Sequence, residues 1–428
     1  MMKEFVAGVI SFFSTSQLLL GFLVCLGLIL ERESFSKILV GTSRTILGLT
    51  ILNAGAGLLV GVLANLTPLI SMSMGGRTFM PVTETVVIGA MGIMAATISG
   101  VFVGAFLVNL LIARITRWKY VMLSGLHMIF ISSLLPLVVA PAGLVGIPSV
   151  IVCSIIGGIM YTYMPAITQR FTKIITGDQP VSVGHPGATG YALSAWLGSK
   201  LGDPSKSTED LKISDKWDFL NDYAVIAAIV MFVLFLACTL VIGPSVMETT
   251  LKTSQNWIAF SLLQAFTFAS GIMLVLYGVR IMLAEIVPAF HGIAEKLIPN
   301  AIPALDCPIM FSFAPNAVII GFIASMVGGV FATVAIKLAA GFFVIPPITE
   351  HFFMGGTAAI YGNATGGRKG AVIGAVIMGI GLTALPLLLW QFTKVGVPQP
   401  VGMVDTDLVL WGSATGAIAR LIHSIFVH

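Results

Sequence analysis

The sequence predicts an all-α integral membrane protein with about 10 or 11 transmembrane helices. Of its 428 residues, 57% are hydrophobic and only 9% are charged, and the mean hydropathy is +1.02. Soluble domains carry roughly 25% charged residues, and one membrane helix needs about 20 apolar residues, so the chain has room for about ten spans. The net charge of +4 is small and scattered, which argues against nucleic-acid binding.

Apolar stretches give the expected spans in chain order. Before a long polar stretch they are Leu18–Leu30, Thr45–Leu63, Val86–Ala113, Tyr120–Val139 and Ala142–Tyr163. After it they are Ala224–Gly243, Trp257–Val287, Asn316–Ala335, Leu338–Ile348, Ala371–Trp390 and Asp407–Val427. Two of these segments are short or interrupted, so the expected number of spans is approximate.

The polar stretch Thr168–Asp222 divides into two parts. Its first half is rich in Gly and Ala and only half polar, which predicts a re-entrant hairpin in a protein-lined or water-lined place. Its second half, from Lys200, is a mixed-charge loop that either docks cytosolic machinery or caps the protein. The basic cluster Arg114, Arg117 and Lys119 places the short loop that carries it in the cytoplasm.

An internal duplication is a further prediction, with one half running to about Tyr163 and the other starting near Ala224. The stretches Gly57–Pro68 and Gly278–Pro288 look alike, each running from Gly to Pro in about ten residues. Short matches in apolar sequence also arise by chance, so both interpretations stay open.

Asp306 is the most informative ionisable residue. A carboxylate at membrane depth costs several kcal/mol without a partner or ligand, so it predicts a functional site. The segment around it carries Pro299, Pro303, Pro308 and Pro315, which no continuous spanning helix tolerates. A broken hydrophobic segment with an acid at the break is how many transporters build a substrate site.

Two interpretations of Asp306 compete. In the first, Asp306 accepts hydrogen bonds from the hydroxyl groups of a polyol-like ligand, with Ser312 nearby. In the second, it is a buried structural partner of Arg280 or Lys337. The break in the segment favours the ligand, because a structural ion pair rarely needs one.

His185 is flanked by Gly184 and Pro186 at a loop tip in a segment that can enter the bilayer. A neutral imidazole both donates and accepts hydrogen bonds, so His185 can line a polar cavity, or it can form a turn at the membrane surface. Glu84 begins an apolar run, where an acid caps a helix or adds to the cavity. His127 is expected to be structural, bonded by serines: Ser124, Ser132 and Ser133.

Other chemistries are not indicated. The Gly-rich run from Phe352 lacks the GxxxxGK[ST] spacing of a phosphate loop and predicts a re-entrant or connecting loop instead. The four cysteines make no metal-binding spacing, and no catalytic set is visible. We therefore expect no metal, no cofactor and no enzymatic activity.

Several long motifs carry a family resemblance that covers most of the chain. They are LLLGFLVCLGLILERESFSKILVGTSRTILGLTILNAGAGLL, VSVGH, STEDLKISDKWDFLNDYAVIAAIVM and AEIVPAFHGIAEKLIPNAIPALDCPIMFSFAPNAV. With these motifs the chain resembles the membrane-embedded IIC component of the bacterial phosphoenolpyruvate-dependent phosphotransferase system. It is similar to the L-ascorbate-specific branch and, more distantly, to the galactitol branch.

The resemblance implies one polytopic IIC domain over residues 1–428, without a IIA or IIB domain, in the bacterial inner membrane. It implies about eleven helices, two re-entrant hairpins, a homodimer in contact with lipid, and a core that moves as an elevator. The core would include residues 168–200 and 285–320, and the remaining helices would form the scaffold. A separate IIB protein, supplied by IIA, would phosphorylate the translocated sugar or sugar acid.

The resemblance also assigns site residues. His185, from the family's GH motif, and Asp306, from its DC motif, match positions in the substrate site. Pro186 and Gly187 stand where the ascorbate pattern has two glutamines, and His127 is displaced by one residue from an SGH-type motif. The expected substrate-binding residues are Asp306, His185, Gly184, Pro186, His127, Ser124, Glu84 and Ser312.

These departures leave the substrate open. L-Ascorbate is the leading candidate, with a related pentitol or sugar acid as the alternative. A different class of function, an ion-coupled secondary transporter that uses Asp306 as its coupling carboxylate, also fits the sequence. A passive channel is a weaker third possibility.

Overall fold

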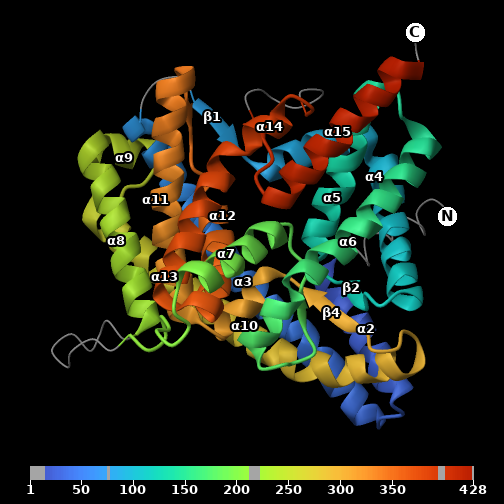
Figure 1. Ribbon diagram of the computed structural model, residues 1–428. Helices are drawn as coiled ribbons and strands as arrows, with labels where there is room; N and C mark the ends of the chain where they lie inside the picture. The colour runs from blue at the N-terminus through green and yellow to red at the C-terminus, as the bar shows by residue number, and fades with distance from the viewer. Residues whose placement is uncertain (1–14, 75–77, 212–221, 394–400, 427–428) are drawn as a thin grey trace.

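The structure, a computed structural model, describes residues 15–74, 78–211, 222–393 and 401–426. Nine helices in this described part are long and apolar enough to cross a membrane. Large apolar side chains such as Ile88, Leu107 and Leu338 are exposed on the outside, where lipid would cover them. The all-α membrane class is therefore confirmed, and most of the chain is helical (Figure 1).

The order of elements occurs twice. The first unit is α3 (Phe35–Met74), β1 (Thr78–Pro81), α4 (Thr83–Ile115), β2 (Tyr120–Met122), α5 (Gly125–Val139), α6 (Gly146–Thr176), β3 (Ser182–Val183) and α7 (Ala188–Leu201). The second is α10 (Trp257–Lys296), β4 (Ile302–Leu305), η3 (Cys307–Ser312), α11 (Pro315–Ala340), β5 (Phe343–Val344), α12 (Ile348–Glu350), η4 (His351–Gly355), α13 (Gly356–Ala384), α14 (Pro386–Trp390), β6 (Val401–Gly402) and α15 (Thr406–Phe426). Outside the repeat lie α2 (Ser16–Leu30), α8 (Tyr223–Ile242) and α9 (Pro244–Thr250).

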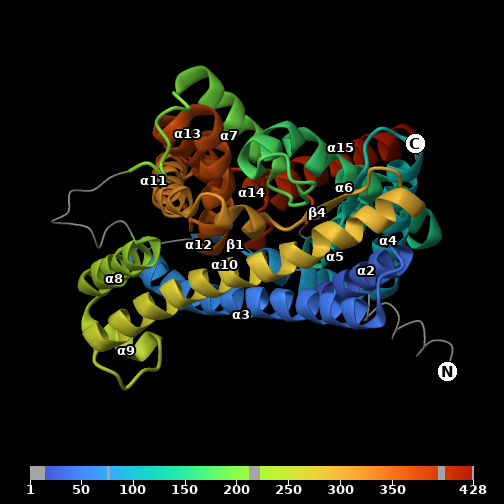
Figure 2. The same cartoon turned by 90° about the horizontal axis from the view of Figure 1, so that it is seen from below.

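The repeated order supports the predicted duplication but moves its bounds, because the first unit continues through α7 and the second begins at α10. The leading helices α3 and α10 each have 40 residues and lie side by side (Figure 2). They run antiparallel, with Gly48 against Met282 and Gly55 against Gly271. Antiparallel first elements are what inverted repeats produce.

Two small parallel sheets join the units. One has the strand order β2-β4-β3 and the other has β5-β1-β6. The first strand of each unit is thus the central strand of the other unit's sheet. Because all three strands of a sheet run the same way, their carboxyl ends meet at one edge, which brings distant parts of the chain together.

The chain reverses direction inside α13. Gly367 has φ +56°, a left-handed conformation that favours glycine, and the helix is interrupted there. The His351 Nε2 and Thr383 Oγ1 atoms are 3.2 Å apart. In a straight helix, residues 32 positions apart would be separated by about 48 Å. The segment from Ile348 therefore folds as a helical hairpin, and the loop expected after Phe352 is in fact helical.

Other expected elements also need correction. A span at Leu338–Ile348 is wrong, because Gly341 ends α11 with φ +78° and a strand follows. The expected span Tyr120–Val139 is found as a candidate membrane span, but it begins later, at Gly125, because Tyr120–Met122 forms a strand. The first half of Thr168–Asp222 forms the end of α6, then β3 and α7, and a re-entrant position for this part stays a prediction. Residues 212–221 of the expected mixed-charge loop lie outside the described residues.

The apolar core has two parts that flank the sheets. One cluster is formed mainly by residues of α3, α8, α10, α11 and α13 and includes Leu59, Phe268 and Phe352. The other lies among α4, α5, α6 and α15 and includes Leu134 and Met160. Glycines permit several of these helices to approach closely, as where α4 and α6 pack through Gly104 and Gly158.

Candidate functional site

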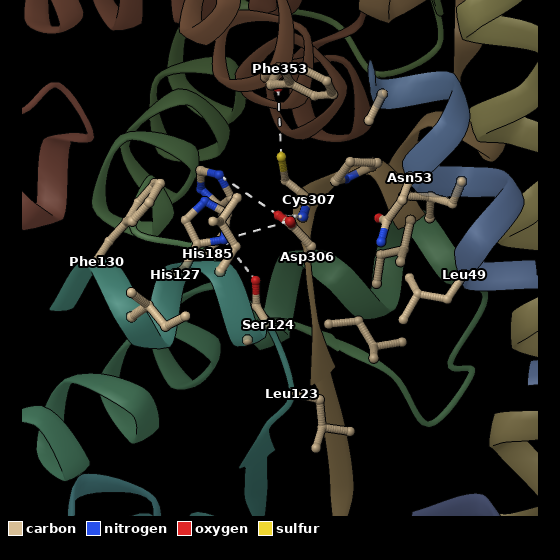
Figure 3. A pocket seen from close by; sticks show the side chains of 18 of the residues that line it. Leu49, Asn53, Leu123, Ser124, His127, Phe130, His185, Asp306, Cys307 and Phe353 are labelled. Atoms are coloured by element: carbon tan, nitrogen blue, oxygen red, sulfur yellow. Dashed lines mark hydrogen bonds and ion pairs between the residues drawn. The ribbon is translucent and has the colours of Figure 1, made fainter. Parts of the chain in front are cut away.

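The carboxyl ends of one sheet bring three predicted residues together. Asp306 follows β4 directly, His185 follows β3 by two residues, and His127 lies in the first turn of α5 after β2. Figure 3 shows the three side chains converging from these separate segments. The parallel strand order therefore places together residues that are far apart in the chain.

The two imidazoles face one carboxylate. His127 Nδ1 lies 3.6 Å from Asp306 Oδ2, and His185 Nε2 lies 3.8 Å from Asp306 Oδ1 (Figure 3). The Asp306 side chain is 37% exposed, whereas those of His127 and His185 are 8% and 4% exposed. The carboxylate is thus the accessible member of the group, and the imidazoles lie behind it. Asp306 also caps η3, since it accepts a hydrogen bond of 2.6 Å from the Cys307 backbone N–H.

Neighbouring hydroxyl groups orient both rings. Ser124 Oγ lies 2.7 Å from His127 Nδ1, and Tyr191 OH lies 3.0 Å from His185 Nδ1. The Tyr191 ring stacks on Tyr361 with 5.5 Å between ring centroids, which fixes the phenol that supports His185. With its Nδ1 occupied in this way, His185 presents Nε2 to the carboxylate.

A cavity of about 440 Å³ opens in front of these residues. Volumes of about 300–1,000 Å³ are usual for small-molecule sites. Ser124, His127, His185 and Asp306 form part of its polar lining, and Leu49 and Asn53 of α3 line another side. The cavity therefore lies between the long helix α3 and the strand ends.

The other predicted site residues lie differently. Gly184 and Pro186 flank His185 in the chain, but neither residue lines the cavity. The Gly184 N–H donates to the Leu305 carbonyl at 2.7 Å, and a Cβ there would come within 2.5 Å of the Met122 sulfur. Ser312 is also outside the lining, and its hydroxyl donates to the Ile309 carbonyl. Glu84 lies in the first turn of α4, but its side chain is outside the described residues.

Sequence reasoning missed two acidic residues of the cavity, Glu350 and Asp405. Each follows a strand of the second sheet, β5 or β6, by three to six residues. Strand-end position could have indicated them, but strands of two residues leave little signal in an apolar sequence. Among the described ion pairs, Asp306 pairs with histidines rather than with Arg280 or Lys337. Lys337 instead donates to the Gly341 carbonyl.

The same three residues could hold a metal ion. One ligand atom from each of His127, His185 and Asp306 lies within 4.8 Å of the others. Two imidazoles and a carboxylate suit a divalent transition metal. The same set equally suits hydroxyl groups, because the carboxylate accepts hydrogen bonds and neutral imidazoles do both.

Residues 11–408 match the family described as PTS system sugar-specific permease component. The chain belongs to this family. A relative from Mycoplasma pneumoniae (strain ATCC 29342 / M129 / Subtype 1), named ascorbate-specific PTS system EIIC component, is 24% identical over 444 residues. That alignment covers 86% of this chain, and the chain spans 64% of the relative's length. Membership of this permease family and the membrane-length helices of the described residues indicate a multi-pass plasma-membrane protein.

In this permease component, Asp407 holds the loop of His185. Asp407 is fully buried, and its carboxylate accepts hydrogen bonds from the backbone N–H and the hydroxyl of Thr189. Its own N–H donates to the Pro186 carbonyl at 2.8 Å. These hydrogen bonds join Asp407, at the start of α15, to Pro186 and Thr189. The short segment between His185 and α7 is therefore held at both of its ends.

Replacing Asp407 by asparagine should destabilise the folded protein. The amide offers one uncharged acceptor in place of two charged oxygens, so Thr189 loses a charge-assisted hydrogen bond, at a cost of about 1–3 kcal/mol. Thermal unfolding in detergent would measure the effect as a lower midpoint. Asp178→Asn is the control, because Asp178 is exposed and makes only a 3.8 Å contact with Lys173. Equal midpoints for both variants would contradict the prediction.

Proposed function

We propose that the protein translocates L-ascorbate or a similar small polyol, which a separate IIB protein then phosphorylates. The convergence of His127, His185 and Asp306 on one cavity is the observation that carries this proposal. The ascorbate-specific name of the Mycoplasma relative supports the choice of ascorbate as the first candidate.

The chemistry of the cavity suits a polyhydroxylated ligand. Asp306 can accept hydrogen bonds from two hydroxyl groups, and the oriented imidazoles can accept from, or donate to, further hydroxyls. Apolar side chains such as Leu49, Phe130 and Phe353 would cover the carbon skeleton. A site that bonds each hydroxyl rejects analogues that lack one, which gives selectivity among similar sugars.

The location of the cavity supports an elevator as the mode of transport. Its polar side is built on the strand ends, and the side facing them is built mainly from apolar residues of α3, with Asn53 as an exception. We propose that the strand-end elements form the core and carry the ligand past such an apolar surface. The homodimer and the IIA and IIB partners are implied by the resemblance and are part of the same proposal.

Transport assays with purified protein in liposomes would test the proposal. The ligand panel is L-ascorbate, galactitol, xylitol and arabitol. We expect one of them to bind and to appear inside as the phosphorylated product only when phosphoenolpyruvate, IIB, IIA and the general phosphocarrier proteins are supplied. Uptake of unphosphorylated ligand driven by a proton or sodium gradient, without IIB, would instead establish the ion-coupled alternative.

A further inference from the structure

The second sheet repeats the geometry of the first. The ends of β5 and β6 lead into Thr349, Glu350 and Asp405, and all three residues line the cavity that contains Asp306. The end of β1 leads into Thr83, which contacts Asp405. One cavity therefore receives the carboxyl ends of two sheets that the internal repeat relates to each other.

Asp405 is buried and accepts a hydrogen bond from Thr83. Asp405 is 4% exposed, and its Oδ2 atom lies 3.4 Å from the Thr83 hydroxyl oxygen. Thr83 Oγ1 in turn accepts a hydrogen bond of 3.1 Å from the Val404 N–H. Thr83 at the start of α4 thus links Asp405 to the segment that follows β6, which favours a defined position of the carboxylate at the cavity.

Glu350 is anchored through the residue that follows it. His351 is fully buried, with Nδ1 at 2.6 Å from the Ser325 hydroxyl and Nε2 at 3.2 Å from the Thr383 hydroxyl. These contacts fix the start of the helical hairpin to α11 on one side and to its own second half on the other. The backbone of Glu350 is thus held at the cavity wall.

We infer that Asp405 and Glu350 form a second half of the binding site and hold different hydroxyl groups of the ligand from those at Asp306. This inference rests on the proposed function. Three carboxylates and no Lys or Arg are found among the described lining residues. Such a lining offers hydrogen-bond acceptors to hydroxyl groups at both ends of a ligand.

The test pairs each variant with a ligand that lacks one terminal hydroxyl. Galactitol is compared with 1-deoxygalactitol, and L-ascorbate with 6-deoxy-L-ascorbate, by calorimetric binding to the purified full-length protein. Asp405→Leu and Glu350→Met remove the acceptors with little change of size. Asp405→Asn serves if Asp405→Leu does not fold, and Asp210→Asn, at an exposed residue outside the lining, is the control.

For wild type and the control, we expect loss of the terminal hydroxyl to weaken binding about tenfold. In at least one cavity variant, removal of the terminal hydroxyl from the ligand should weaken binding by no more than about twofold. The reason is that the variant no longer has the carboxylate that accepts a hydrogen bond from this hydroxyl. A purely structural role of Asp405 would weaken both ligands equally and leave the tenfold ratio unchanged.

A tenfold ratio retained in both cavity variants, with binding still lost in His185→Ala, would overturn the second half-site and leave the proposed function standing. If wild type binds none of L-ascorbate, galactitol, xylitol and arabitol, the proposed function itself fails, and this inference fails with it.

Discussion

Replacement of Asp306 by asparagine is expected to weaken ligand binding by about 10- to 100-fold. Asp306 is the exposed carboxylate of the site and faces both His127 and His185. An amide accepts hydrogen bonds through only one oxygen and carries no charge, so it loses the stronger, charge-assisted bonds to hydroxyl groups. His185→Ala should have an effect of similar size, because it removes the ring behind the carboxylate.

Calorimetric titration of the purified variants with the panel ligand that wild type binds would measure these losses. His423→Ala is a suitable control, because His423 lies near the end of α15 and outside the cavity lining. Binding that survives in both Asp306→Asn and His185→Ala would mean that the two residues are structural. The ligand would then have to be sought at Glu350 and Asp405.

Introducing a side chain at Gly379 should prevent normal folding. A Cβ at this position would lie 1.9 Å from the Ser325 carbonyl oxygen, which belongs to the backbone of α11 and cannot rotate away. A Cβ at Gly328 would likewise lie 2.1 Å from the Val376 carbonyl oxygen on the facing helix. Gly379→Ala must therefore separate α11 from the hairpin, at a cost of about 3 kcal/mol.

The yield of monodisperse protein after detergent extraction and its unfolding midpoint would measure this effect. Gly381→Ala is a close control, because the nearest atom to a Cβ there is 3.6 Å away, an ordinary contact. Equal yields and midpoints for Gly379→Ala and Gly381→Ala would show that the two helices are not packed as described.

The membrane class, most of the helices and part of the site could be predicted from the sequence. Composition and the length of apolar runs decide whether a chain spans a membrane, and both are local properties. The closely spaced prolines around Asp306 likewise predict a break near that residue, because each proline removes a backbone hydrogen-bond donor and several in succession prevent a continuous helix. His185 and Asp306 could be named as site residues from their own surroundings and from the resemblance.

Only the tertiary structure decided which residues meet. Strands of two to four residues, such as β2, β3 and β4, carry almost no periodic signal, yet the pairing of β2 and β3 with β4 brings His127 and His185 to Asp306. The partner of a strand lies elsewhere in the chain and is chosen by packing of the whole fold. For the same reason the sequence did not predict that Glu350 and Asp405 would line the cavity, or that the chain would reverse at Gly367.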